Sequence, residues 1–489
     1  MKELALSALE TAKTKGATYA DIRLVNRKYE FLNVKDGAIG ALDQGDNLGF
    51  GIRVIADGAW GFASSDDMSK ESFDKTAALA VKIAKASART KIKDVKLAPA
   101  KAYTDSWEAP YKIDPFTVPL EKKLELLHKL HDLMVKVKGV SNTSSTMSFV
   151  NEDKTFASTE GSYITQKRIR SGVGMDVTAT DANDTQDRSF PAGSGQHILG
   201  GYELIEELPL EQNAQRIAEE AVALLTAPVA PGGKQDLIIS ASHVGLQIHE
   251  SCGHPIELDR VMGEEAGFMG KSFLTPDKLG TFKYGSELVN IVASSTEPRG
   301  LGTFAYDDEG VPAQRWDIVK NGIFKGYLTS RETCSIAKEK ESRGCMRADG
   351  WNRIPMIRMV NISLMPGTWK LEDLIEDTKD GLLLETTKSW SIDQLRLNFQ
   401  FACQVAWEIK KGKKGRMYKN PVYQGITNEF WNSCDAICNQ GYWALWGTPN
   451  CGKGEPMQSM EMSHGAAPAR FRQVTCGAGY TQGLKKGVR

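Results

Sequence analysis

Residues 20–65 read ADIRLVNRKYEFLNVKDGAIGALDQGDNLGFGIRVIADGAWGFASS, and this stretch decides the fold of the N-terminal part. Its apolar and β-branched runs are separated by Asp36-Gly37 and Asp57-Gly58, dipeptides that favour the tight turns of β-hairpins. An apolar stripe typical of a helix then covers Lys70–Ser87, behind capping-type serines. The stretch therefore predicts an antiparallel meander followed by a helix.

The rest of the first half alternates helical and strand-like patterns. Apolar stripes predict helices over 120–137 and 209–225, and the Ser/Thr-rich segment 140–189 alternates as antiparallel strands do. The Pro/Gly-rich connector 227–234 then interrupts every periodicity. Because single cores stop growing at about 250–300 residues, we expect a domain boundary in this connector.

The second half is predicted to be rich in strands. Asn321-Gly322 lies between two strand-like runs and suits a type I′ hairpin turn. One helix is predicted over 428–438. The expected fold class is α+β, with antiparallel and mixed sheets and packed helices in two domains, 1–226 and 234–489. The second domain is expected to carry the chemistry.

Composition narrows the class of protein. The 61 basic and 61 acidic residues cancel, so nucleic-acid binding is not expected. We find no uninterrupted apolar stretch near the ~18 residues that a membrane span needs. The eight cysteines all lie beyond residue 250, a pattern that favours free thiols or metal ligands in a reducing, cytoplasmic compartment. Two of them, Cys434 and Cys438, are expected in the core.

The segment LIISASHVGLQIHESCGH, residues 237–254, is predicted to be a strand that runs into a helix carrying a metal site. Its His249 and His254 flank Glu250, but five positions on a regular helix separate two side chains by roughly 140°. A π-bulge would absorb one residue, and Ser251 and Gly253 are weak helix formers that suit it. The competing interpretation is a pair of ordinary, hydrogen-bonded histidines.

A third ligand is needed, with a fourth position left open for water. One candidate is Cys451, which stands in the Gly/Pro-rich loop TPNCGKGEP, where Lys453 would promote its deprotonation. The competing interpretation of Cys451 is a small buried thiol, the commoner role of a cysteine. Two nitrogen ligands and one sulfur suit zinc better than magnesium or calcium. The other candidates for the third ligand are Cys476, His464, His243 and Cys252.

Several segments together resemble the TldD/PmbA peptidases along nearly the whole chain. They are the N-terminal meander, HESCGHPIELD, DDEGVPAQRWDIVKNGIFKGYLTSRE, RIPMIRMVNISLMPG and NCGKGEPMQ. The resemblance implies one zinc ion per chain, with His249, His254 and Cys451 as ligands and Glu250 as the catalytic base. It implies a TldD-like, metal-binding subunit that hydrolyses unstructured peptides or small unfolded proteins. It also implies a dimer, either a homodimer or a heterodimer with a PmbA-like (TldE) subunit.

Other interpretations remain open at this stage. The same ligands would serve another metal-dependent amidohydrolase, and the family has also been labelled as non-catalytic modulators of DNA gyrase. Three arginines are candidates for gripping a chain terminus, against ordinary ion pairing: Arg331, Arg353 and Arg358. Three tryptophans are candidates for a ligand-stacking surface, against core packing: Trp431, Trp443 and Trp446.

Overall fold

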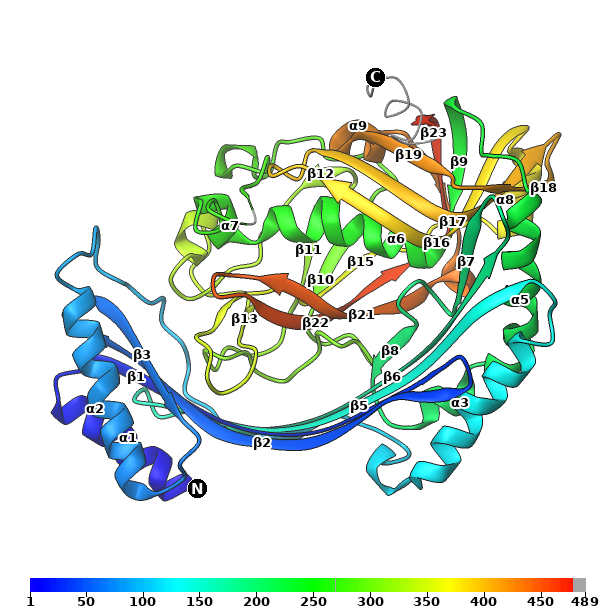
Figure 1. The fold of residues 1–489 in the computed structure, drawn as a ribbon. Helices are drawn as coiled ribbons and strands as arrows, with labels where there is room; N and C mark the ends of the chain where they lie inside the picture. The colour runs from blue at the N-terminus through cyan, green and yellow to red at the C-terminus, as the bar shows by residue number, and fades with distance from the viewer. Residues whose placement is uncertain (269, 478–489) are drawn as a thin grey trace, which may run out of the picture.

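The computed structural model describes residues 1–268 and 270–477. Its N-terminal part is built on a long, curved, mostly antiparallel sheet that forms the base of the molecule in Figure 1. Among the described residues this sheet has eight strands, in the order β3-β2-β1-β5-β6-β4, and both β7 and β8 also pair with β6. The strands are β1 Tyr19–Lys35, β2 Ala38–Ala56, β3 Ala59–Ser65, β4 Thr104–Glu108, β5 Val140–Ser158, β6 Tyr163–Thr180, β7 Thr185–Phe190 and β8 Gln196–Leu199.

Two groups of helices pack near the opposite ends of this sheet (Figure 1). The helices α1 (Lys2–Thr14) and α2 (Lys70–Ser87) bury an alanine-rich face against β1 to β3. The helices α3 (Leu120–Met134) and α5 (Leu210–Thr226) bury leucine and alanine side chains near the other end. The short α4 (Glu203–Glu207) precedes α5. The meander and each helix predicted in this half are confirmed.

The C-terminal part lies above the concave side of the curved sheet in Figure 1 and contains the largest hydrophobic core. Among the described residues it has sheets of seven strands (β16-β9-β23-β19-β17-β18, with β20 on β23), four strands (β12-β11-β10-β15) and two pairs, β13-β14 and β21-β22. Its strands are β9 Gly233–Ile239, β10 Ile291–Ser294, β11 Arg315–Lys320, β12 Ile323–Phe324, β13 Met346–Arg347, β14 Met356–Ile357, β15 Asn361–Leu364, β16 Asp380–Ile392, β17 Asn398–Lys410, β18 Lys413–Lys419, β19 Val422–Ile426, β20 Cys434–Ile437, β21 Ala444–Lys453, β22 Gln458–Ala466 and β23 Ala469–Cys476. Its α-helices are α6 Ala241–Ile248, α7 Leu258–Met262, α8 Leu371–Asp377 and α9 Thr427–Asn432. The α+β class predicted from the sequence is confirmed.

The predicted hairpin turns are present. Asp36, Asp57 and Asn321 have φ angles of 50°, 51° and 48°, and each is followed by a glycine that also has a positive φ. A type I′ turn requires this pair of left-handed residues, which is why the Asp-Gly and Asn-Gly dipeptides predicted the turns correctly.

The helix predicted over 428–438 is wrong in its second half. Helix α9 ends at Asn432, and Cys434 begins the strand β20, which pairs antiparallel with β23. The partner strand is distant in sequence, so the local periodicity does not reveal it. Both Cys434 and Cys438 are nevertheless buried in the core, as expected.

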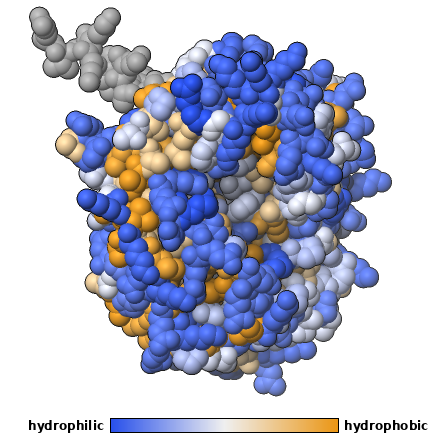
Figure 2. Space-filling view, turned by 90° about the vertical axis from the view of Figure 1, so that its right-hand side faces the viewer, coloured by the Kyte–Doolittle hydropathy of each residue, from blue (hydrophilic) through white to orange (hydrophobic). Residues whose placement is uncertain are grey.

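Charged side chains fill much of the contact between the curved sheet and the C-terminal part. Arg53 of β2 pairs with Glu309, and Arg23 of β1 pairs with Asp308, and all four side chains are buried. Hydrophilic residues cover most of the face shown in Figure 2. None of the helices formed by residues 1–268 and 270–477 is long and apolar enough to cross a membrane.

Candidate metal centre

The HESCGH run lies on a continuous helical segment whose geometry changes at His249. Strand β9 leads into α6, which ends at Ile248, and residues His249–Gly253 then form a π-helical turn. A 3-10 turn from His254 to Ile256 follows. The predicted departure from a regular α-helix is therefore present, and it adds the residue that five-position spacing requires.

Buried hydrogen bonds hold the π-helical turn in place. Ser251, at its centre, donates to the carbonyl of Gln247 and accepts from Trp431 Nε1 at 2.9 Å. The carbonyl of Ser251 accepts from Tyr284 Oη, also at 2.9 Å. Because Trp431 is fully buried, its interaction with this turn assigns it to the core rather than to a ligand-stacking surface.

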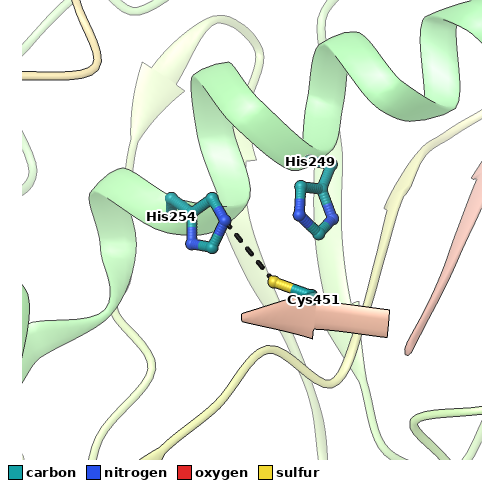
Figure 3. Close-up of side chains that lie close together, drawn as sticks. All are labelled: His249, His254 and Cys451. Carbon is teal, nitrogen blue, oxygen red and sulfur yellow. Dashed lines mark hydrogen bonds between the residues drawn. The ribbon is translucent and has the colours of Figure 1, made fainter. Parts of the chain in front are cut away.

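The two histidines of the run face the same space, shown in Figure 3, with ring centroids 4.8 Å apart. Their outer partners determine which ring nitrogen faces that space. His254 Nδ1 lies 3.0 Å from Glu257 Oε2, and an ionised carboxylate only accepts, so Nδ1 carries the proton. The lone pair of His254 is therefore on Nε2.

The tautomer of His249 follows from a chain of two hydrogen bonds. His464 Nδ1 lies 2.9 Å from the carbonyl of Ile362, so it donates there, and its Nε2 is left as an acceptor. His249 Nδ1 lies 2.8 Å from this Nε2 and donates to it. Nε2 of His249 thus keeps its lone pair for a metal, an arrangement typical of metal-binding histidines.

Cys451 of β21 completes a group of three donors. Its Sγ lies 3.5 Å from His254 Nε2 (Figure 3), and the candidate donor atoms of Cys451, His249 and His254 all lie within 4.8 Å of one another. Donors of a tetrahedral zinc site with bonds of 2.0–2.3 Å are roughly 3.5 Å apart, so a small contraction would close the site. Among the described residues this is the one such group, and its donor set fits zinc.

Burial controls the protonation of these groups. It lowers the pKa of His254 to about 3 and that of His249 well below its ordinary value, so both imidazoles are neutral, the form that binds metal. Burial raises the pKa of the Cys451 thiol to about 11, and Arg358 opposes the shift. The expectation that Lys453 activates this thiol is not met, because its Nζ lies 2.7 Å from Asp259 Oδ1, in a buried ion pair.

Glu250 is buried beside the three donors, and both of its carboxylate oxygens have partners. Trp390 Nε1 donates to Oε1 at 2.9 Å, and Arg396 Nη1 donates to Oε2 at 3.1 Å. Burial raises the pKa of Glu250, while the charge of Arg396 and the hydrogen bond from Trp390 lower it, with a net increase. The carboxylate thus sits in a site where its basicity is higher than in water.

The three donor residues, Glu250 and its two partners Trp390 and Arg396 line a cavity of about 550 Å³. Its walls come from the π-helical turn, from β16 and the turn after it, from β21, and from the loop between β7 and β8. Trp446 lines it, whereas Trp443 donates to the carbonyl of Leu364. A cavity of this size with convergent polar groups is typical of a small-molecule or peptide site.

The remaining candidates for the third ligand lie outside the three-donor group. His243 bonds to Thr387 and Tyr423, and burial raises the pKa of both Cys252 and Cys476 to about 12. His464 contacts His249 rather than the donor space itself.

The arginines considered for gripping a chain terminus do not line the cavity. Arg331 pairs with Glu160 at 2.7 Å, and Arg358 donates to the backbone carbonyls of Cys451 and Gln458. Arg358 therefore helps to hold the strand that carries the thiol. The arginine in the cavity is Arg396, which the sequence did not single out.

Two imidazoles and a thiol that face one open space beside a buried glutamate form the donor set of a metal-dependent hydrolase. Comparisons with known proteins lead to the same class. The profiles of the PmbA/TldA metallopeptidase domain 1, central domain and C-terminal domain match residues 20–84, 113–226 and 232–477. The chain belongs to the PmbA/TldD family, and it is a metallopeptidase.

Relatives match along most of the chain. A metalloprotease of Methanocaldococcus jannaschii is 32% identical over 86% of this chain and 89% of its own length. A metalloprotease of Methanothermobacter thermautotrophicus is 30% identical over 94% of this chain and 95% of its own length. A protein of Saccharolobus solfataricus named as a zinc metalloprotease TldD homolog is 24% identical over 88% of this chain and 90% of its own length.

Solved structures share the fold. A structure described as a putative modulator of a DNA gyrase, from Thermotoga maritima, has a TM-score of 0.77 at 17% identity and covers 97% of this chain and 100% of its own. TldE from Thermococcus kodakarensis has a TM-score of 0.73 at 16% identity, with 97% and 100% covered.

Proposed function

We propose that the protein is a TldD-like zinc peptidase that hydrolyses unstructured peptides or small unfolded proteins. His249, His254 and Cys451 would hold one zinc ion per chain, and Glu250 would be the catalytic base. The observation that supports this proposal best is the convergence of the three donors within 4.8 Å of one another, beside the buried Glu250. A bound zinc ion would lower the pKa of a water molecule to about 7 and polarise a carbonyl group.

The protein's own residues would then carry the proton transfers. Glu250 would accept a proton from the attacking water and later give it to the nitrogen of the departing amine. Trp390 and Arg396 hold the Glu250 carboxylate in one orientation, so its oxygens would be in the same position for both proton transfers. His464 and Glu257 would keep the two imidazoles in the tautomer that leaves Nε2 for the metal.

Strand edges beside the cavity support an extended peptide as the substrate. Within the part of the chain that the structure describes, β21 pairs with the single strand β22, while Gln196 bonds to the main chain of β21 at Leu445 and Gly447. In the same part of the chain, residues 387–392 of β16 pair with β17 but not with β9. Both segments contribute residues to the cavity wall. A peptide that adds to such an edge is held by main-chain hydrogen bonds, which give weak sequence preference.

We also propose a dimer, either of two copies of this chain or with a TldE-like subunit, whose fold this chain shares. All eight cysteines are unpaired, which supports a reducing, cytoplasmic compartment for the reaction. Another metal-dependent amidohydrolase would use the same donors. A gyrase modulator without catalysis is the remaining alternative, and its function would not depend on the metal.

Metal analysis combined with a peptide-cleavage assay tests the proposal. The purified protein should contain about one zinc per chain, the ratio expected for a single three-ligand site. It should cleave unstructured oligopeptides, lose this activity with a chelator, and regain it with zinc. Cleavage of simple amides in preference to peptides would favour the amidohydrolase. Full peptidase activity in metal-free protein would reject the zinc mechanism.

A further inference from the structure

The hairpin formed by β16 and β17 enters the cavity and contacts Glu250. Trp390, near the end of β16, and Arg396, in the following turn, donate to different oxygens of the carboxylate. Arg396 also lines the cavity, and its side chain is 11% exposed. A cation therefore lies next to the candidate base, on the side of the space that a substrate would occupy.

The turn that carries Arg396 is tightly fixed. The Asp393 carboxylate accepts from the backbone N–H of Leu397 at 2.8 Å and from Asn398 Nδ2 at 2.6 Å. The carbonyl of Arg396 accepts from Thr427 Oγ1 at 3.0 Å. Such anchoring would hold the guanidinium at one place in the cavity wall.

Arg396 has a φ of 63°, in the left-handed region where glycine is the default residue. A non-glycine residue in that conformation costs free energy, of order 1–3 kcal/mol, and such residues cluster at functional sites. The position therefore carries an arginine despite the conformational cost. Arg299, which does not line the cavity, has the same φ, so it is the contact with Glu250 that points to a role for the Arg396 side chain.

We propose that Arg396 is a catalytic residue whose guanidinium contacts the carbonyl oxygen of the peptide bond under attack while it stays beside Glu250. The inference rests on the proposed peptidase function. In the attack, the water oxygen bonds to the carbonyl carbon, the π electron pair moves onto the carbonyl oxygen, and the water proton passes to Glu250. The oxygen's electron pair then re-forms the C=O bond as the C–N bond breaks, the C–N electron pair goes to the nitrogen, and Glu250 returns the proton there.

Charge explains why an arginine suits this place. During the attack, negative charge leaves the Glu250 carboxylate and appears on the carbonyl oxygen. A guanidinium has five N–H donors in one plane and can contact two oxygens at once. Placed beside both, Arg396 interacts with the negative charge before and after the transfer. Such fixed donors in a water-poor site are often the largest contribution to catalysis.

Arg299 provides a matched control, because it also has a φ of 63° and pairs with a carboxylate, that of Glu207 at 2.6 Å, but does not line the cavity. Zinc-loaded Arg396→Gln should have parent metal content and a kcat lower by about 10²–10³-fold, the effect of losing one transition-state donor. Its KM should stay within about 3-fold of the parent, because the contact with the carbonyl oxygen becomes strong only as negative charge develops on that oxygen. Arg299→Gln should leave kcat within about 3-fold of the parent. Arg396→Lys should recover part of the loss, and it carries the test if the glutamine variant fails to fold.

Binding gives a second readout that needs no turnover. A peptide with an anionic phosphonate in place of the scissile amide should bind Arg396→Gln about 100-fold more weakly in calorimetry, in line with the loss in kcat. The matching amide peptide should bind the Glu250→Gln variant and the double variant Glu250→Gln/Arg396→Gln with nearly equal affinity.

Three outcomes would overturn the inference. The first is a glutamine variant that keeps the parent kcat and the parent affinity for the phosphonate. The second is a rise in KM for peptides with a free C-terminal carboxylate but not for their amides, which would make Arg396 an anchor for the chain terminus. The third is a parent protein that binds zinc and the phosphonate but cleaves no peptide, which refutes the proposed function as well. In the first two outcomes the peptidase function stands.

Discussion

Replacement of Glu461 by glutamine tests how the curved sheet supports the metal-site strands. Glu461 lies on β22, next to the residue that pairs with Cys451, and it forms ion pairs with Arg168, Arg170 and Arg347. Burial raises the pKa of Glu461, but the three arginines outweigh burial and lower it from 4.5 to about 2. At 1.36 kcal/mol per pKa unit, this difference corresponds to about 3 kcal/mol of stability at neutral pH.

Because the pKa of Glu461 is lowered in the folded state, this contribution is complete well above pH 4.5 and disappears as the pH falls toward 2. Native-state hydrogen exchange at pH 7 should show the amides of β22 opening about 10²-fold more often in Glu461→Gln. The excess should shrink below pH 4.5. Glu71→Gln, which removes an exposed pair with Lys75, is the control and should change nothing measurable. An effect of Glu461→Gln that is equal at pH 7 and pH 3 would refute the electrostatic explanation.

Three further substitutions test the site. Glu250→Gln should keep the parent zinc content and lose cleavage by at least about 10²-fold, and turnover at the parent rate would remove Glu250 as the base. His464→Ala should weaken zinc binding about 10–100-fold in a chelator competition, because His249 loses its 2.8 Å partner; unchanged affinity would contradict that role. Gly253→Ala would place a Cβ 2.1 Å from a buried sulfur and should lower stability by about 1–3 kcal/mol in urea unfolding. Gly245→Ala on α6, where the nearest atom is 3.4 Å away, is its control and should unfold at or above the parent midpoint.

Features set by neighbouring residues could be predicted from the sequence. The turns at Asp36 and Asn321 depend on dipeptides that accept left-handed φ angles. The π-helical turn follows from the five-residue spacing of His249 and His254. The division into domains 1–226 and 234–489 stays a prediction.

Features that depend on distant partners could not be predicted. Arg396 reaches Glu250 across 146 positions, and His464 reaches His249 across 215. Nothing near either residue in sequence indicates these contacts, because tertiary packing creates them. The helix predicted over 428–438 failed in its second half for the same reason, since a strand distant in sequence pairs with Cys434.

X-ray absorption spectroscopy of the zinc-loaded protein tests the central claim most directly. If His249, His254 and Cys451 hold the ion, the spectrum will fit one sulfur at about 2.3 Å, with nitrogen and oxygen ligands at about 2.0–2.2 Å. The sulfur contribution will disappear in Cys451→Ser. A parent spectrum with no sulfur ligand, or a sulfur that survives the serine substitution, would contradict the three-residue site.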